Sequence, residues 1–360
     1  MLLVKKINKK IATVVGARPQ FIKAAVVSRE IARFKNLQEV IIHTGQHYDA
    51  NMSDVFFRQM QIPEPSYNLS VNNLSHGAMT GRMIEKIEEV FLIEKPDIVL
   101  VYGDTNTTLA AALAAVKLHI KVAHVEAGMR SYNKQMPEEI NRVLTDHVSS
   151  ILFCPTKQAV KNLTKEGFTS TKNKIIFTGD VMYDASIFFA PYMQMPAFNI
   201  PDKFVLSTIH REENTSDSSK LIEIISALNV LHKNIPVLMP VHPGTKKLLQ
   251  QYGCEILFNL VEPAGYLQMI GLLKKCALVI TDSGGLQKEA YFFEKPCITI
   301  REQTEWIELI DSGANILAKT NKNDIIKKAK HMLKSKINFQ HKFYGDGNAA
   351  SKIASFLSNL

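Results

Sequence analysis

Ionisable side chains follow several apolar segments of this chain, where buried strands are expected to end. Asp104 and Glu126 each come after a run rich in Val, Ile and Leu, Glu138 opens a helical segment, and His210 follows another apolar run. Ligands of open parallel sheets bind at the carboxyl ends of the strands. Each residue alone is better explained as a helix cap or a polar contact. Several carboxylates gathered beside Arg and His, however, are typical of sites that transfer protons.

A glycine-bearing turn follows another expected strand. The segment Thr281–Glu289 reads Thr-Asp-Ser-Gly-Gly-Leu-Gln-Lys-Glu, so that Ser283, Gly284 and Gly285 lie between a strand and a helix. Free backbone N–H groups and the positive end of the helix dipole suit a diphosphate, which glycines allow to approach closely. Glu289, about one turn further along, can accept hydrogen bonds from ribose hydroxyls. A capped helix with no ligand is the alternative, and both interpretations stay open.

Cations and further histidines stand at other strand ends. Arg18 and Lys23 follow the first apolar run, in a turn that lacks the second and third glycines of G-x-G-x-x-G, so a nicotinamide cofactor is not expected. On their own, these two residues are as well explained as surface groups at a helix start. His242, in Pro-Val-His-Pro, is comparable to His210. The histidines are scattered along the chain, and no metal site is expected.

The elements that must position these residues alternate in a regular way. The first half has expected strands at Ile11–Val15, Val40–Thr44, Ile98–Tyr102, Val122–Val125 and Ile151–Phe153, with helical segments between them, one of them at Asp54–Gln59. The second half has expected strands at Phe204–Thr208, Val237–Pro240, Ile256–Leu260, Leu278–Thr281 and Cys297–Ile300. Near-continuous apolar strands alternating with helices indicate parallel sheets covered on both faces.

A Pro- and Met-containing segment at Tyr192–Pro201 interrupts this alternation and predicts a linker. We therefore expect an α/β protein of two Rossmann-like domains with a cleft between them. The first domain is expected at 1–190 and the second at 191–344, with a helical segment at the C-terminal end, 345–360.

Composition excludes several other classes of protein. The chain has 360 residues, of which 46% are hydrophobic and 21% charged, as is ordinary for a globular enzyme. Its four cysteines form no C-x-x-C pair, which fits a reducing compartment. The net charge of +9 comes from scattered residues and from two lysine-rich patches, Lys5–Lys10 and Lys327–Lys336. These favour solvated surfaces over a nucleic-acid interface. No apolar run approaches the ~20 residues of a membrane span, and no signal peptide is evident, so we expect a cytoplasmic protein.

Over essentially its whole length the chain resembles the non-hydrolysing UDP-N-acetylglucosamine 2-epimerases. The matching segments are Gly16–Pro19, Tyr102–Thr105, His124–Gly128, Pro137–Arg142, Pro240–Pro243, Thr281–Gly285 with Glu289, and Tyr344–Gly347. The resemblance implies a GT-B-like fold in which a C-terminal helix, at about Ser351–Leu357, crosses back to the first domain. It also implies a homodimer, no cofactor, and a role in bacterial surface polysaccharide synthesis.

The resemblance implies a reaction and a set of site residues. The C2 proton is removed and UDP is eliminated, leaving a 2-acetamidoglycal, to which UDP adds back with protonation of the opposite face. The implied acid/base set is Asp104, Glu126, Glu138 and His210. The implied UDP-binding set is Arg18, Lys23, His242, Tyr266, Ser283, Gly284, Gly285 and Glu289, with Tyr266 where the family places the uracil. We expect UDP to close the cleft.

Two departures from the common family pattern point to a subgroup. Many members have Gly-Thr-Arg-Pro-Glu and Thr-Glu-Arg-Pro-Glu, whereas this chain has Gly-Ala-Arg-Pro-Gln at 16–20 and Thr-Glu-Trp-Ile-Glu at 304–308. With His43–Ser53, these segments look more like the enzymes that act on UDP-2,3-diacetamido-2,3-dideoxyglucuronate. Two alternatives stay open: a GT-B glycosyltransferase that uses a UDP-sugar, and a hydrolysing 2-epimerase that releases the free sugar.

Overall fold

The computed structural model describes residues 8–46, 62–170 and 172–360. The chain divides into unit 1, Met1–Ala185 with Lys342–Leu360, and unit 2, Ser186–His341. The boundaries predicted from the sequence lie a few residues further along, at 190/191 and 344/345. The expected helix at Asp54–Gln59 and part of His43–Ser53 lie outside the described residues.

Unit 1 is built on a parallel sheet whose strands run in the order β3-β2-β1-β4-β5-β6-β7. Its central strands are runs of Val, Ile, Ala and Leu that are buried along their length, as in a sheet covered on both faces. The strands are β1 (Lys9–Val15), β2 (Leu37–His43), β3 (Tyr67–Asn68), β4 (Ile98–Tyr102), β5 (Lys121–Val125), β6 (Ile151–Cys154) and β7 (Lys174–Phe177).

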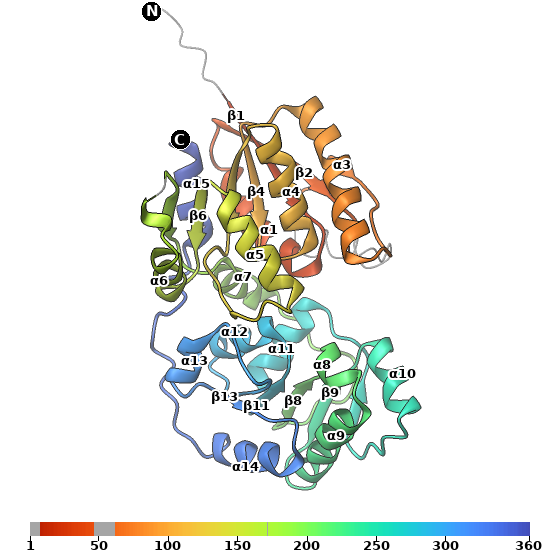
Figure 1. Ribbon diagram of the computed structural model, residues 1–360. Coiled ribbons are helices and arrows are strands. Elements are labelled where there is room, and N and C mark those ends of the chain that lie inside the picture. The colour runs from red at the N-terminus through yellow and green to blue at the C-terminus, as the bar shows by residue number, and fades with distance from the viewer. Residues whose placement is uncertain (1–7, 47–61, 171) are drawn as a thin grey trace, which may run out of the picture. The chain divides into compact units, whose positions relative to one another are not determined.

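Helices connect the strands of unit 1 and pack on its sheet. The Ala-rich α4 is almost completely buried, with α3 and α5 packed beside it (Figure 1). Thr105 caps α4 by accepting a hydrogen bond from the Thr108 N–H. The helices are α1 (Arg18–Ile31), α3 (His76–Glu94), α4 (Asn106–Lys117), α5 (Pro137–Val148), α6 (Lys157–Lys165) and α15 (Ala349–Ser358), while α7 (Val181–Phe189) runs through the boundary between the units.

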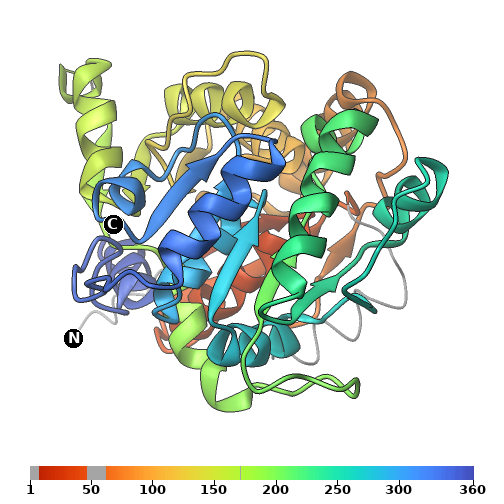
Figure 2. The same ribbon diagram turned by 90° about the horizontal axis from the view of Figure 1, so that it is seen from below.

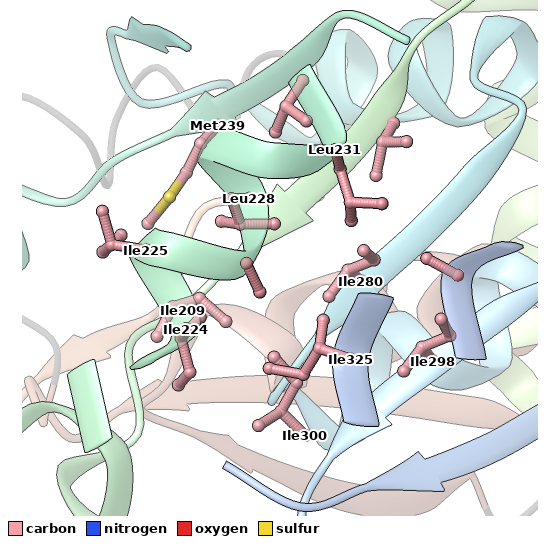
Figure 3. Close-up of a cluster of buried hydrophobic side chains, with 14 of the residues drawn as sticks. Ile209, Ile224, Ile225, Leu228, Leu231, Met239, Ile280, Ile298, Ile300 and Ile325 are labelled. Atoms are coloured by element: carbon pink, nitrogen blue, oxygen red, sulfur yellow. The ribbon is translucent and has the colours of Figure 1, made fainter. Parts of the chain in front are cut away.

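Unit 2 repeats the plan with a second parallel sheet, ordered β10-β9-β8-β11-β12-β13. Figure 2 shows α9 (green) and α14 (blue) side by side over one face of this sheet. Figure 3 shows the core that they enclose, in which Leu228 and Leu231 of α9 face Ile280 and Ile298 of the strands. Burying each such side chain contributes roughly 1.5–3 kcal/mol.

The elements of unit 2 have these bounds. The strands are β8 (Val205–Thr208), β9 (Val237–Pro240), β10 (Asn259–Val261), β11 (Leu278–Thr281), β12 (Cys297–Ile300) and β13 (Asn315–Ala318). The helices are α8 (Glu212–Thr215), α9 (Ser218–His232), α10 (Pro243–Gln251), α11 (Tyr266–Lys275), α12 (Gly284–Phe292), α13 (Ile307–Asp311) and α14 (Lys322–Met332).

Each sheet reverses its strand order once, and that reversal locates a binding edge. In unit 1 the switch lies between β1 and β4, and in unit 2 between β8 and β11. Ligands of doubly wound sheets bind outside the carboxyl ends of the strands at such a point. Arg18 and Asp104 follow the two switch strands of unit 1, and His210 and Ser283 follow those of unit 2. The predicted fold class, two parallel α/β units with a C-terminal helix belonging to the first, is confirmed.

Several predicted elements differ in the structure. The strand expected at Ile256–Leu260 lies at Asn259–Val261, since the residues before it form an irregular connection. The predicted linker, Tyr192–Pro201, belongs to unit 2, where the Gln194 N–H donates to the Leu267 carbonyl at 3.1 Å. Gly271 permits that approach, because a Cβ there would meet the Gln194 carbonyl at 2.5 Å. Among the described residues, no helix is long and apolar enough to cross a membrane.

The C-terminal helix is held to unit 1 by a buried carboxylate. Asp184 of α7 accepts a hydrogen bond from the Ala350 N–H in the first turn of α15, at 2.7 Å. This satisfies one of the backbone donors that the start of a helix leaves without an intrahelical partner. Burial raises the pKa of Asp184 from its ordinary value of 3.8 to about 6, against the lowering effect of the Ala350 and Ala349 N–H groups.

We expect this carboxyl group to make stability depend on pH. Because its pKa is higher in the folded chain than in the unfolded one, the folded chain binds the proton more tightly. The free energy of unfolding should therefore fall as the pH rises from about 4 to about 6, by roughly 2–3 kcal/mol. Denaturant unfolding across this range should show the fall in the wild type and a flatter profile in Asp184→Asn. Parallel profiles would contradict the prediction.

Candidate active site

Asp104 is fixed by an arginine that sequence reasoning missed. Its Oδ2 accepts hydrogen bonds from Arg142 Nε at 3.1 Å and Arg142 Nη2 at 2.5 Å. Arg142 is nearly buried on α5, while the Asp104 side chain keeps 32% of its surface exposed. A two-point contact of this kind locks the orientation of the carboxylate. Asp104 therefore presents a rigid, accessible carboxylate at the end of β4.

Glu126 and Lys23 form an ion pair against the backbone of Gly103. Lys23 Nζ contacts Glu126 Oε2, and both side chains are about nine-tenths buried. A Cβ on Gly103 would lie 3.1 Å from Lys23 Nζ and 3.2 Å from Glu126 Oε2, so the missing side chain makes room for the pair. Glu126 has a φ of +76°, a strained backbone for a non-glycine residue. Such strain clusters at functional sites. Three predicted residues, Lys23, Asp104 and Glu126, thus lie together at the switch point of unit 1.

The neighbouring carboxylates Glu138 and Glu139 at the start of α5 have different environments. Glu139 is buried and accepts hydrogen bonds from the Ser131 N–H at 2.8 Å, the Tyr132 N–H at 2.9 Å and Arg142 Nη1 at 3.0 Å. These hydrogen bonds occupy the oxygens of the Glu139 carboxylate and hold the loop that precedes α5. Glu138 is half-buried and makes no hydrogen bond to any described residue. Of the two, only Glu138 has oxygens available for a ligand.

The first switch strand ends in a turn that requires a glutamine. Gln20 is buried, and its Oε1 accepts hydrogen bonds from the N–H groups of Gly16 and Ala17 at 2.8 and 3.0 Å. Its Nε2 donates to the Tyr102 carbonyl at 2.9 Å. A glutamate could make the first two bonds but not the third. Gln20 therefore ties the end of β1 to the end of β4 and places Arg18, half-buried at the start of α1, beside them.

In unit 2 the start of α12 is open to a ligand. Ser283 is the N-cap, whose side chain accepts from the Leu286 N–H at 3.4 Å. A Cβ on Gly285 would meet nothing within 4 Å, so no packing contact among the described residues requires a glycine there. Glu289 is half-buried one turn further along the same helix. The N–H groups at a helix start have the chemistry to bind an anion.

A buried arginine stands beside the same helix start. Arg301 follows β12, and its side chain is only 3% exposed, paired with Glu305 at 3.1 Å. A Cβ on Gly284 would lie 2.7 Å from Glu305 Oε1 and 3.7 Å from Arg301 Nη1, so Gly284 makes room for this pair. Sequence reasoning missed Arg301. Arg301 could have been identified from the sequence by its position directly after a predicted strand.

His210 is positioned by Asp282, which is completely buried. The Asp282 carboxylate accepts from the backbone N–H groups of His210 and Arg211 at 3.0–3.2 Å and from Asn214 Nδ2 at 3.2 Å. His210 Nδ1 lies 3.4 Å from Asp282 Oδ1, and half of the imidazole is exposed. The loop after β8 thus presents His210 at the switch point of unit 2.

Two other predicted residues have local roles in the structure. His242 is the N-cap of α10, and its Nδ1 accepts from the Gly244 N–H at 3.3 Å. Tyr266, the first residue of α11, is buried, with its ring packed edge-on against Phe189 at 5.8 Å between centroids. Their expected contacts with UDP remain predictions.

Trp306 lies in the segment 304–308, where the chain departs from the common family pattern, and its side chain has a structural role. Lys288 of α12 is buried, and its Nζ lies 4.0 Å from the centroid of the Trp306 ring. A cation is attracted electrostatically to the face of an indole ring. Trp306 therefore stabilises the charge of Lys288, the residue that precedes Glu289. Within residues 8–46, 62–170 and 172–360, no cluster of His, Cys, Asp and Glu could hold a metal ion.

The two parallel α/β units, one with a carboxylate cluster and the other with the helix start of α12, have a GT-B-like architecture. The family model of UDP-N-acetylglucosamine 2-epimerase matches residues 29–358. The chain belongs to this family and is therefore an isomerase.

Similar proteins cover nearly the whole chain. A UDP-2,3-diacetamido-2,3-dideoxy-D-glucuronate 2-epimerase of Pseudomonas aeruginosa is 52% identical over 353 residues, covering 98% of this chain and 100% of that protein. A UDP-N-acetylglucosamine 2-epimerase of Methanococcus maripaludis is 42% identical, covering 97% and 98%. The structure of the Methanocaldococcus jannaschii UDP-GlcNAc 2-epimerase in complex with UDP-GlcNAc and UDP superposes with a TM-score of 0.88 at 39% identity, covering 98% and 100%.

Proposed function

We propose that this chain is a non-hydrolysing 2-epimerase of a UDP-N-acetylated sugar that interconverts the gluco and manno configurations at C2. The observation that carries the proposal is that the carboxylates of unit 1 have different hydrogen-bond partners. Asp104 and Glu126 are held in place by Arg142 and Lys23, while Glu138 keeps its oxygens available beside the fully bonded Glu139. Inverting a carbon centre through a planar intermediate requires proton-transfer groups on both of its faces.

The proposed reaction balances without an external reagent. A carboxylate takes the C2 proton, the C–H electron pair forms the C1–C2 double bond, and the C1–O bond breaks with its electrons on the departing UDP. UDP then adds back to C1 of the 2-acetamidoglycal, and an acid delivers a proton to the opposite face of C2. Asp104, Glu126, Glu138 and His210 are the proposed acid/base set.

Unit 2 has the chemistry to bind the departing nucleotide. The start of α12 offers N–H groups and a helix dipole to the diphosphate, with the buried Arg301 guanidinium beside Gly284. Glu289 is proposed to accept hydrogen bonds from the ribose hydroxyls. Arg18 and Lys23 of unit 1 are proposed to provide positive charge for the diphosphate.

The favoured substrate is UDP-2,3-diacetamido-2,3-dideoxyglucuronate. The Pseudomonas aeruginosa enzyme named for that substrate is 52% identical to this chain, against 42% for the Methanococcus maripaludis enzyme named for UDP-N-acetylglucosamine. We expect a higher kcat/KM with the diacetamido-uronate. Steady-state kinetics with both UDP-sugars check this, and a preference for UDP-N-acetylglucosamine would refute it. A role in surface polysaccharide synthesis, a cytoplasmic location and a homodimer stay predictions; a mass measurement at micromolar concentration checks the last.

The reaction type is tested by NMR of the protein with a UDP-sugar in D2O and no acceptor. We expect a new UDP-sugar that carries solvent deuterium at C2, because the abstracted proton exchanges with water. Release of the free sugar would instead identify a hydrolysing epimerase. An unchanged UDP-sugar would favour a glycosyltransferase, and product that retains its original C2 hydrogen would exclude the elimination mechanism.

A further inference from the structure

A completely buried histidine lies directly behind the carboxylate cluster of unit 1. His124 is on β5, two residues before Glu126, and its side chain has no exposed surface. Its Nδ1 is 2.7 Å from Asp146 Oδ1, and its Nε2 is 2.7 Å from the carbonyl oxygen of Gly103. Gly103 immediately precedes Asp104. One imidazole ring thus connects both loops that carry predicted catalytic carboxylates.

Both partners of the ring are hydrogen-bond acceptors. A carbonyl oxygen cannot donate. Asp146 is ionised, because its other oxygen accepts from Arg130 Nη1 at 2.7 Å and from the Gly128 N–H at 3.0 Å. Burial alone would raise the pKa of Asp146, but the bonds and charges of His124 and Arg130 hold it below its ordinary value. A neutral imidazole has one nitrogen without a proton, which would face an acceptor lone pair at 2.7 Å. Both ring nitrogens must therefore donate.

The surrounding charges also favour a charged ring. Arg130 also forms a bidentate contact with Glu166, through Nε at 2.8 Å and Nη2 at 2.7 Å. Two carboxylates, Asp146 and Glu166, then face Arg130 and His124. Glu166 is exposed to solvent, whereas Asp146 is completely buried and shares Arg130 with it, so a charged His124 completes the charge compensation of Asp146. On the other side of Gly103, Lys23 and Glu126 already neutralise each other.

We propose that His124 is a positioning residue, a doubly protonated imidazolium that sets the spacing of Asp104 and Glu126 for epimerisation; its catalytic consequence rests on the proposed function. The geometry of the two loops supports this role. Gly103, with a φ of +65°, donates its N–H to the Val125 carbonyl at 2.9 Å, while its own carbonyl is held by the ring. Glu126 follows with its strained backbone. Charge-assisted bonds are roughly twice as strong as neutral ones, so they can hold such a turn.

The charge on the ring is tested in the wild-type protein, without reference to activity. Histidine labelled with ¹⁵N should show, at about pH 8, one ring with protons on both nitrogens, although an ordinary imidazole (pKa about 6.5) is neutral there. In Asp146→Asn, this resonance should change to that of a neutral ring, which assigns it to His124. A neutral tautomer of His124 in the wild type at this pH would overturn the proposal.

The positioning role is tested by separating turnover from nucleotide binding. We expect His124→Gln to lower kcat by roughly 10–100-fold, because an amide NH2 cannot replace two donors at opposite ends of a charged ring, while the Kd for UDP changes less than about twofold. The exposed His147 on α5 provides the control, since His147→Gln should retain wild-type kcat. Wild-type kcat in folded His124→Gln would overturn the role. If that variant does not fold, Asp146→Asn is measured in the same way with the same expectation.

The two tests also separate this proposal from the proposed function. A doubly protonated ring in a protein that epimerises no UDP-sugar would leave the charge assignment intact and refute the function. A neutral ring in an active epimerase would refute the charge assignment and leave the proposed function intact.

Discussion

Replacing Glu138 by glutamine is expected to lower kcat by roughly 10²–10⁴-fold, and Asp104→Asn and Glu126→Gln are expected to have effects of similar size. Each amide keeps the shape of the side chain but cannot exchange a proton. The Kd for UDP should change much less, because the proposed nucleotide contacts lie mainly at α12 of unit 2. Steady-state kinetics and UDP titration calorimetry on the same preparations measure the two quantities.

The adjacent residue is a matched control for Glu138. Glu139→Gln should lower the free energy of unfolding by about 1–3 kcal/mol, because it replaces a buried, charged acceptor of four hydrogen bonds. Glu138→Gln should leave the free energy of unfolding nearly unchanged, since its side chain makes no hydrogen bond to any described residue. Near-wild-type turnover in the Glu138, Asp104 and Glu126 variants would mean that these carboxylates are only structural groups.

Gly285→Ala is expected to stabilise the protein and weaken UDP binding at the same time. Alanine in a helix is favoured over glycine by roughly 0.5–1 kcal/mol, and the added methyl group would meet no atom within 4 Å. The same methyl group would occupy space proposed for the diphosphate, so the Kd for UDP should rise by roughly 10–100-fold, which corresponds to about 1.4–2.8 kcal/mol. Thermal unfolding and calorimetry measure the two opposite changes.

A second exposed helical glycine separates these effects. A Cβ on Gly81, in α3 of unit 1, would likewise meet nothing within 4 Å. Gly81→Ala should give a similar gain in stability with an unchanged Kd for UDP. Equal UDP affinities in Gly285→Ala, Gly81→Ala and the wild type would show that the start of α12 does not bind the diphosphate.

Local patterns in the sequence were sufficient to predict the architecture of the two parallel sheets. Buried parallel strands read as continuous apolar runs, so the inner strands of both sheets could be predicted, whereas β3, β7 and β13 were missed. These three lie at sheet edges, where half-exposed residues such as those of β7 have no continuous apolar pattern. The strand-end rule also identified the residues at both switch points, because parallel strands bring their carboxyl ends to one edge whatever the details of packing.

The sequence by itself determined the fold class, the switch-point residues and the family resemblance, all of which depend on residue type and order. Only the tertiary structure distinguished Glu138 from Glu139, which are identical and adjacent in the sequence but differ in their bonded partners. It also revealed Arg142 behind Asp104, and His124 between Gly103 and Asp146. The contact of Arg142 with Asp104 and those of His124 with Gly103 and Asp146 join residues that are 21 to 38 positions apart in the chain. The availability and charge of a side chain are set by such neighbours, which no local pattern specifies.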